Sequence, residues 1–453
     1  MIEILYLASS VAFIVGLRRL SGPRTAVSGN RLAALGMLLA LVLTLLAQDI
    51  VNWRTVMAGL FVGTVVGAWA AIRVKMTAMP QMVAAFNGFG GIASALVAAA
   101  EALELGLDGL APETSVSIMA STVIGAVTFT GSFVAFAKLQ GLMPGRPLVF
   151  PGQRFLNALI GIAVVVFALW AGFTGESFGY WIVGALSLLL GISAVVPIGG
   201  ADMPVVISLL NSFSGLAAAA AGFVIESNPL IIGGALVGAA GLILTFQMTE
   251  AMNRSLGNVL FSGFGTGAGG VGVMSDKPVN RATADDVAIT LGYADSVIIV
   301  PGYGLAVAQA QHAVRDLAKE LEERGVGVNY AIHPVAGRMP GHMNVLLAEA
   351  DVPYEQLLDL EQANPKFPHT DAVLIVGAND VVNPSARDDP GSPIYGMPVL
   401  EVDKAGKVIV IKRSLSPGFA GIDNPLFYRD NTMMLFADAK QALEQSLAAL
   451  KRL

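Results

Sequence analysis

The chain of 453 residues contains no cysteine and only four histidines, and charged residues make up 13% of it. Without cysteine there is neither a disulfide framework nor a thiolate metal site, and a reducing compartment is weakly favoured. The formal net charge of −6 gives no reason to expect nucleic-acid binding, which depends on basic surface. We therefore expect no metal site and no nucleic-acid partner.

Charge is scarcest before Ser262. Residues 1–261 hold 11 Lys+Arg and 10 Asp+Glu, which leaves 27 − 11 = 16 and 33 − 10 = 23 for residues 262–453. All four histidines fall in this second, acidic part, whose net charge is 16 − 23 = −7. The division predicts a membrane domain over 1–261, a flexible glycine-rich linker over 262–274 and a soluble domain over 275–453.

The first part is built from long apolar stretches, and a stretch of roughly 17–25 residues can cross a ~30 Å hydrocarbon core. Their interiors contain no Asp, Glu, Lys, Arg or His, so a proton path through them would use water, amides and hydroxyls. Glycine pairs such as Gly59/Gly63 and Gly234/Gly238 predict close helix packing. The sequence predicts about nine membrane helices, at 2–17, 32–48, 55–72, 81–100, 115–137, 155–173, 178–196, 203–225 and 229–249.

Basic residues concentrate in alternate connections between these stretches. Even-numbered loops are acidic or poor in charge, so the positive-inside rule places the N-terminus outside and the soluble domain in the cytoplasm. Glu3 precedes the first apolar run and arginines follow it, which is the opposite polarity to a cleaved signal peptide, so this run is expected to remain as a span. The basic positions are Arg18, Arg19, Arg24 and Arg31 in the first loop, Arg73 and Lys75 in the third, Lys138, Arg146 and Arg154 in the fifth, and Arg254 after the last span.

An internal repeat lies within the spans. Residues 79–91 match residues 203–215 at an offset of 203 − 79 = 124, and Met-Pro is expected to begin a helix in both copies. Asn87 and Asn211 occupy the same position of the repeat, and an amide inside a bilayer needs a partner or water. They either form hydrogen bonds between helices or line a hydrated path. Asp202, just before the second copy, is either a carboxylate at the cytoplasmic mouth or a solvated helix cap.

The second part alternates between strand and helix patterns, which predicts a Rossmann-like α/β domain with a mostly parallel sheet. The expected helices are Leu305–Arg324, Met343–Glu349, Tyr354–Gln362 and Ala437–Leu450. The expected strands are Ser296–Val300, Gly327–Ile332, Ala372–Val376, Val399–Val402 and Val408–Ile411.

A glycine turn follows the first of these strands, as in dinucleotide-binding folds. Gly302 and Gly304 would give a tight turn and a close approach to phosphate, with Val307 at the third-glycine position. The second strand ends without the acid that commonly binds the ribose of NAD. Lys412-Arg413-Ser414 after another strand suits the 2′-phosphate of NADP, or is a solvated basic turn.

A membrane domain joined to a dinucleotide domain leaves three functional classes open. The first couples nucleotide chemistry to transport across the bilayer. The second is a transporter or channel regulated by a cytoplasmic NADP-sensing domain. The third is a membrane-anchored NADPH reductase without proton coupling, against which the repeated Asn87 and Asn211 argue.

Several motifs together resemble one family. The chain resembles the β subunit of proton-translocating NAD(P) transhydrogenases over nearly its whole length, in both the apolar part and the α/β part. The motifs that carry this resemblance are Ala201-Asp-Met-Pro204, Asn211-Ser-Phe-Ser-Gly215, Ala251-Met-Asn-Arg-Ser255, Pro301-Gly-Tyr-Gly304, His333-Pro-Val-Ala-Gly-Arg-Met-Pro-Gly341 with the following residues to Ala350, Gly377-Ala-Asn-Asp380, Asn383-Pro384, Asp388-Asp-Pro390, Gly396-Met-Pro-Val-Leu400 and Lys412-Arg-Ser414.

The resemblance implies Si-Re-specific hydride transfer from NADH, on a partner α chain, to NADP⁺ on this chain, driven by inward proton flow. It also implies a homodimer of the αβ unit in a bacterial cytoplasmic membrane. Asp202, Asn211 and Asn87 match positions implicated in proton coupling, and Asp380 matches one near the hydride-transfer face. The implied NADP(H) contacts are Gly302, Tyr303, Gly304, Val307, Val335, Ala336, Gly337, Arg338, Met339, Pro340, Gly377, Ala378, Asn379, Asp380, Val381, Gly396, Met397, Lys412, Arg413, Ser414, Pro417, Gly418, Phe419, Asp438 and Ala439.

Two positions depart from the family pattern. Asn87 stands where many relatives carry histidine, so a group that titrates is not expected there. Phe419 replaces a common tyrosine and removes one hydroxyl. Since the spans lack an ionisable side chain, a helix of the α chain is expected to supply one.

Overall fold

The computed structural model describes residues 2–20, 22, 24–47, 53–75, 78–106, 110–144, 147–252, 255–261, 278–337, 341–392, 394–418 and 420–453. The predicted linker, 262–274, lies outside these ranges. The chain forms two compact units, one of Met1–Phe246 with Leu260–Phe264 and the other of Gln247–Val259 with Gly265–Leu453.

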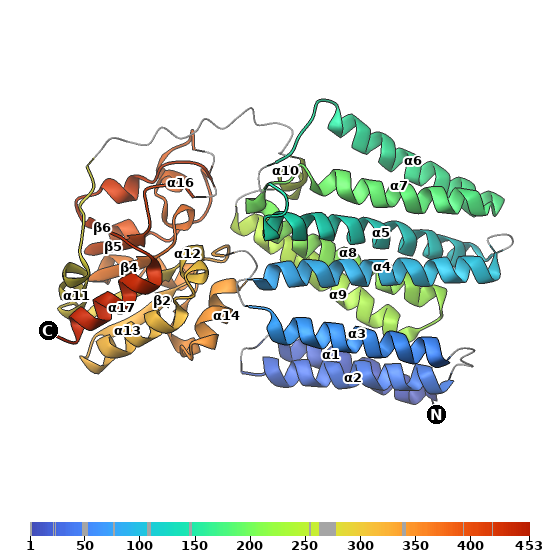
Figure 1. The fold of residues 1–453 in the computed structure, drawn as a ribbon, viewed down its shortest axis with the longest axis horizontal. Helices are drawn as coiled ribbons and strands as arrows, with labels where there is room; N and C mark the ends of the chain where they lie inside the picture. Colours follow the sequence, from blue (N-terminus) through green and yellow to red (C-terminus); the bar gives the residue numbers. More distant parts are fainter. Residues whose placement is uncertain are drawn as a thin grey trace. The chain divides into compact units, whose positions relative to one another are not determined.

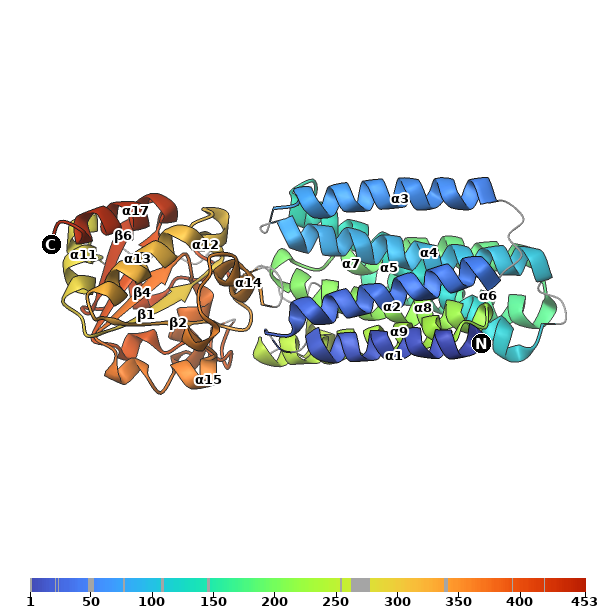
Figure 2. The same cartoon turned by 90° about the horizontal axis from the view of Figure 1, so that it is seen from below.

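The first unit consists of long helices that run alongside one another (Figures 1 and 2). Among the described residues, the eight helices α2 to α9 are long and apolar enough to cross a membrane. Helix α1 carries Glu3, Arg18 and Arg19 and is not among the eight, so the first predicted span stays a prediction. The helices are α1 (Ile2–Leu20), α2 (Ala26–Ala47), α3 (Trp53–Arg73), α4 (Met79–Leu105), α5 (Pro112–Gln140), α6 (Gln153–Thr174), α7 (Ser177–Val195), α8 (Met203–Val224) and α9 (Asn228–Ala251). The end of α9 and most of the short α10 (Leu256–Phe261) belong to the second unit.

Glycine allows close packing at several helix pairs of this unit. A Cβ at Gly234 of α9 would lie 2.4 Å from the backbone nitrogen of Ala219 in α8, so no larger residue fits there. A Cβ at Gly238 would likewise meet Leu216 of α8 at 3.1 Å. Around Gly59 and Gly63 of α3 no described atom lies within 4 Å of such a Cβ. The packing prediction is therefore confirmed for α9, and for α3 it stays a prediction.

The internal repeat is confirmed at the level of helix starts. Both α4 and α8 begin at the methionine of Met-Pro, with the proline in the first turn where its missing N–H is tolerated. A 3₁₀ turn, η2 (Gly200–Asp202), precedes α8. Helices α4 and α8 pack against each other and against α5.

The second unit is a Rossmann-like domain, as predicted. Its sheet has six strands in the order β3-β2-β1-β4-β5-β6, and every neighbouring pair is parallel. Helices α13 and α17 cover one face and α15 lies on the other (Figure 2). The strands are β1 (Ser296–Pro301), β2 (Gly327–Ala331), β3 (Leu357–Leu358), β4 (Ala372–Val376), β5 (Lys407–Lys412) and β6 (Thr432–Phe436). The helices are α11 (Ala284–Gly292), α12 (Tyr303–Val307), α13 (Gln311–Glu323), α14 (His342–Glu349), α15 (Leu360–Ala363), α16 (Ser385–Asp388) and α17 (Ala439–Leu450).

Three predicted elements are wrong in detail. The helix expected at Leu305–Arg324 is two helices, because Gln309 takes a positive φ of 50° that interrupts the helical path. The strand expected at Val399–Val402 is absent from the described fold, where the Leu400 N–H bonds the Val381 carbonyl and a 3₁₀ turn, η7, spans Val402–Lys404. The helix expected at Tyr354–Gln362 is divided into the 3₁₀ turn η4 (Tyr354–Gln356), β3 and α15.

Candidate functional site

The strand order reverses between β1 and β4, which places β2 and β3 on one side and β5 and β6 on the other. In open parallel sheets, ligands bind beyond the carboxyl ends of the strands at such a reversal. The predicted contacts Gly302–Gly304 and Gly377–Val381 follow β1 and β4, and Lys412–Ser414 begins at the last residue of β5. The topology therefore brings these three segments to one edge of the sheet.

The two glycine loops at the reversal pack backbone against backbone. The Gly304 N–H donates to the Gly377 carbonyl at 2.9 Å, and the Gly302 N–H donates to Val376 at 2.9 Å. A Cβ at Gly302 would lie 2.4 Å from Ala378 Cα, and one at Gly377 would lie 2.4 Å from Gly304 Cα. Gly377 also has a φ of +69°. The glycines are thus required for the loops to fit each other, a role that sequence spacing alone does not reveal.

Helix α12, which follows Gly302, has only five residues. Its short length provides fewer aligned peptide dipoles toward an anion than the long helix expected from the sequence. Tyr303 begins α12, and its ring centroid lies 6.4 Å from that of His342. Val307 ends α12 and is 46% exposed, so it does not form the close helix–strand contact of a third glycine.

A buried histidine shapes the loop after β2. His333 Nδ1 accepts from the Val335 N–H at 3.2 Å, so Nε2 carries the proton and donates to the Pro398 carbonyl at 2.7 Å. Burial lowers the pKa of His333 to about 4, although the bond to Pro398 raises it. The ring is therefore neutral at physiological pH. Ala336 and Gly337 follow in the same loop, and the predicted contacts Arg338, Met339 and Pro340 lie outside the described residues.

The segment around Pro398 connects this loop to the one after β4. The Leu400 N–H donates to the Val381 carbonyl at 2.9 Å, while the Pro398 carbonyl accepts from His333. Gly396 has a φ of +81° and donates to Ala386 at 2.8 Å. Gly396 and Met397 are thereby held in the segment that joins the β2 and β4 loops.

Lys412 at the end of β5 is half-buried, and its ammonium group contacts several neighbours. Its ammonium bonds the Ser416 carbonyl and lies 5.0 Å from the Phe427 ring centroid. The Asn379 side-chain amide satisfies its hydrogen bonds when its oxygen faces Lys412. In this orientation the oxygen accepts from Lys412 Nζ at 3.1 Å and from the Gly418 N–H at 2.7 Å. Burial lowers the pKa of Lys412 to about 8, against the opposing effect of Asp380 and Asp423.

The next two residues of this basic cluster face solvent. Arg413 and Ser414 are exposed, and Ser414 Oγ lies 2.8 Å from Ser416 Oγ. The cluster therefore combines one internally bonded cation with one accessible cation.

Asp380 connects the β4 loop to the loop after β5. Its Oδ2 accepts from the Ala420 N–H at 3.0 Å, and a Cβ at Gly418 would lie 2.4 Å from its Oδ1. Pro417 is exposed, and Phe419 lies outside the described residues. The carboxylate thus helps to fix the loop that continues from the basic cluster.

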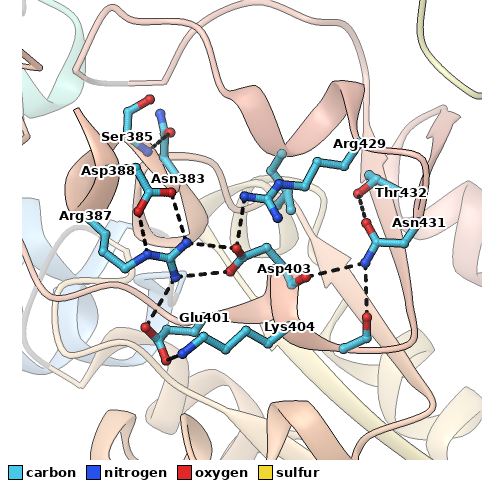
Figure 3. A network of polar contacts seen from close by, with 12 residues as sticks. Asn383, Ser385, Arg387, Asp388, Glu401, Asp403, Lys404, Arg429, Asn431 and Thr432 are labelled. Atoms are coloured by element: carbon cyan, nitrogen blue, oxygen red, sulfur yellow. Dashed lines mark hydrogen bonds and ion pairs between the residues drawn. The ribbon is translucent and has the colours of Figure 1, made fainter.

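Other acidic residues have structural partners. Asp438 caps α17 by accepting from the Lys440 N–H at 3.0 Å, and Ala439 beside it is buried. Arg387 binds Asp388 and Asp403, whose side chain is 7% exposed (Figure 3). Asp389 Oδ1 accepts from the Gly391 N–H at 2.9 Å. Asp388 and Asp389 thus both have partners within their own segment.

The helical unit contains the other predicted positions. Asn87 is buried, and its Nδ2 donates to the Ile207 carbonyl of α8 at 3.2 Å. Asn211 is half-buried within α8, and its side chain makes no hydrogen bond within the described part of the chain. Asp202 is 6% exposed and its side chain does not cap α8, so its interpretation as a solvated cap is wrong.

Hydroxyl groups expected in a polar path bond mainly to backbone carbonyls. Ser121 Oγ donates to Ser94 and Ala217, and Ser212 Oγ donates to Gly238 at 2.6 Å. These bonds link α5 to α4 and α8, and α8 to α9. Sequence reasoning missed Lys138, which it assigned to a loop; the residue is buried in the last turn of α5.

Comparison with known proteins identifies relatives of the entire chain. The family described as "NAD(P) transhydrogenase beta subunit" matches residues 2–449. Two curated sequences from Rhodospirillum rubrum, both described as "NAD(P) transhydrogenase subunit beta", are each 49% identical over 455 residues. Each alignment covers 98% of this chain and 98% of the relative. The resemblance inferred from the motifs is confirmed.

Proposed function

Because the chain belongs to the NAD(P) transhydrogenase beta subunit family, we propose that it binds NADP(H) at the carboxyl edge of its sheet and exchanges hydride with NAD(H) on a partner α chain. The family and the eight apolar helices make it a multi-pass membrane protein. The single observation that carries the proposal is the basic cluster Lys412–Ser414 beside the glycine loops of β1 and β4. Hydride transfer between two nucleotides needs two dinucleotide sites, and another chain would supply the second one.

The residues at this edge fit NADP(H) better than NAD(H). Arg413 and Ser414 are exposed where a 2′-phosphate could reach them, and Arg suits a phosphate because of its forked donors. The loop after β2 begins with the buried, neutral His333, so no carboxylate stands there to repel the phosphate. These features support the 2′-phosphate interpretation of the basic cluster.

The chain's own residues would position the nucleotide and exclude water. NADP(H), when bound, supplies the hydride chemistry, so no side chain here is needed as a nucleophile. Asp380 would fix the loop after β5 through its bond to Ala420, and Lys412 would hold the same loop through Ser416. Gly302 and Gly377 would keep the β1 and β4 loops in the contact that forms the floor of the site.

Proton coupling is the second part of the proposal. Inward proton flow would drive hydride from NADH to NADP⁺ through the region of Asp202, Asn211 and Asn87. One charge moving down ~200 mV supplies about 4.6 kcal/mol. At about 1.4 kcal/mol per decade this shifts the hydride equilibrium by ~10³.

We further propose the setting in which the chain works. By the positive-inside rule, the basic connections would face the cytoplasm together with the soluble unit, and the N-terminus would lie outside a bacterial cytoplasmic membrane. The αβ unit would pair into a homodimer and act with Si-Re stereospecificity, as the resemblance implies. Residues 1–261 would conduct protons and residues 275–453 would bind NADP(H).

Calorimetry of the segment 275–453 with each dinucleotide tests the binding site. We expect the segment to fold alone and to bind NADP⁺ far more tightly than NAD⁺, because only NADP⁺ carries the phosphate for the basic cluster. Equal affinity for the two would contradict the assignment. Tight NADP⁺ binding without hydride exchange in the presence of the α chain would favour the NADP-sensing alternative.

A further inference from the structure

A buried ammonium group holds the turn that leads to Asp202. Lys138, in the last turn of α5, is 5% exposed, and its Nζ donates to the carbonyls of Val196 at 2.5 Å and Ile198 at 2.6 Å. A buried cation is costly unless it is hydrogen-bonded, so these two carbonyls account for its stability there. The sequence places Lys138 near a helix end but does not identify these partners.

The carbonyls that Lys138 binds lie at the end of α7. Val196 is the C-cap of that helix, where carbonyls lack helical partners and carry partial negative charge. Val196 also accepts from the Leu148 N–H at 3.4 Å, which adds the α5–α6 connection to the same point. Lys138 therefore neutralises a helix end and ties it to α5.

The bound turn continues directly into Asp202. The Asp202 N–H donates to the Gly199 carbonyl at 3.1 Å, one residue after Ile198. Asp202 ends η2, and α8 begins at the next residue. Because the backbone joins Ile198 to Gly199, and a hydrogen bond joins Gly199 to Asp202, displacement of Ile198 would be transmitted to the buried carboxylate.

The other copy of the Met-Pro repeat meets the same turn of α5. Gln81, in the first turn of α4, donates from Nε2 to the Leu139 carbonyl at 3.4 Å. Leu139 follows Lys138 in the chain. The last turn of α5 thus joins the start of α4 to the turn that precedes α8, the two helices that carry Asn87 and Asn211.

We propose that Lys138 is a positioning residue for the proton-coupled step: it anchors the turn Val196–Asp202 to α5 and so fixes the carboxylate of Asp202. The inference rests on the proposed function, because it assigns Asp202 a part in proton coupling. Lys138 acts through that turn and needs no contact with NADP(H). Loss of its ammonium leaves two carbonyls without their cation and frees the turn.

The absence of cysteine from the chain allows a direct test of the turn. The buried Ile198 is replaced by cysteine in the full αβ complex in membrane vesicles, and labelling by a membrane-permeant maleimide is followed on the peptide that contains it. We expect Lys138→Met to raise the labelling rate by about tenfold or more, as loss of a charged hydrogen bond predicts. Lys75→Met, which removes an exposed lysine, serves as the matched control and should leave the rate unchanged. An unchanged rate in Lys138→Met would overturn the inference.

Proton-coupled turnover provides the second readout. Lys138→Met should lower it by about tenfold or more, Lys138→Arg should restore at least half of it, and NADP⁺ affinity should stay within about twofold. In the Asp202→Asn background, Lys138→Met should add little, because both changes act through one carboxylate. If the methionine variant does not assemble, Lys138→Gln is used for the same measurements.

The outcomes separate the inference from the proposed function. If the unmodified complex transfers hydride but moves no protons, the proposed coupling fails. If the unmodified complex pumps protons and Lys138→Met and Lys138→Gln pump equally well, only the inference fails. Parallel losses of turnover, NADP⁺ affinity and thermal stability, without rescue by arginine, would show a merely structural lysine and would also overturn it.

Discussion

The side-chain amide of Asn87 donates to the backbone carbonyl of Ile207 at 3.2 Å. Ile207 lies four residues before Asn211, so this carbonyl belongs to the turn of α8 that leads to the second asparagine. Ser214 Oγ in turn donates to the Asn87 carbonyl at 3.2 Å. The two equivalent asparagines of the repeat therefore have different surroundings: Asn87 connects α4 to α8, and Asn211 is left half-buried beside that connection.

Because of this difference, replacing each asparagine by alanine should have a different effect. Asn87→Ala should cost about 1 kcal/mol of stability through the lost interhelical bond. Asn211→Ala should slow proton-coupled turnover with little change in stability, because no hydrogen bond within the described chain is lost. Thermal unfolding and proton pumping of both variants in vesicles provide the measurements. Slower pumping in Asn87→Ala alone would reverse the assignment.

Gly302→Ala should destabilise the soluble unit. The added Cβ would meet Ala378 at 2.4 Å, and forcing the β1 and β4 loops apart should cost about 1–3 kcal/mol. Gly327→Ala at the start of β2 is the matched control, since its Cβ would have its nearest neighbour at 3.6 Å. Urea unfolding of the two variants should separate them, and equal stability would show that the loops can move apart freely.

The pKa of Lys412 predicts how NADP⁺ affinity depends on pH. In the unliganded protein the pKa is about 8, below the ordinary 10.5, so the lysine is charged below pH 8 and loses its proton above it. A phosphate favours the charged form, so affinity should be constant below pH 8 and fall above it by up to about tenfold per pH unit. Lys412→Arg should abolish the fall, because arginine stays protonated. Calorimetry between pH 7 and pH 10 tests this, and the same slope in both proteins would rule out Lys412 as its source.

Arg413→Ala should weaken NADP⁺ binding by about 1.5–3 kcal/mol, the contribution of a charged hydrogen bond. NAD⁺ binding should change little, because NAD⁺ lacks the 2′-phosphate. Arg452→Ala removes another exposed arginine of the same unit and should affect neither nucleotide. If Arg413→Ala bound NADP⁺ as tightly as the unmodified chain, the basic cluster would be no more than a solvated turn.

The sequence predicts those features that depend on neighbours along the chain. The strand Ala372–Val376 and the Met-Pro starts of α4 and α8 are recovered because apolar runs and proline act locally. Strand β6, Thr432–Phe436, was missed, since its pairing with β5 determines its conformation. The apolar segment Val399–Val402 is expected to be a strand, but it is buried because it packs on the core of the domain. The Leu400 N–H bonds the Val381 carbonyl instead of a neighbouring strand.

Features of the candidate site that join distant segments could not be read from spacing. Gly304 and Gly377 touch across the reversal of the strand order, which only the folded sheet creates. Lys138 illustrates the same limit, because a lysine near a helix end can face headgroups or the carbonyls of another helix. Because Lys138 is buried, this chain itself contributes an ionisable group to its helical unit, so such a group need not come entirely from a partner chain.

Reconstitution of the chain in sealed vesicles, with and without an α-type partner, tests the central claim most directly. NADH-to-NADP⁺ hydride transfer and proton movement are measured in the same preparation. We predict that the chain alone transfers no hydride, since it has one dinucleotide fingerprint, and that the αβ complex transfers hydride at a rate that rises when an inward proton gradient is imposed. Full turnover by the single chain, or turnover of the complex that is insensitive to the gradient, would contradict the account.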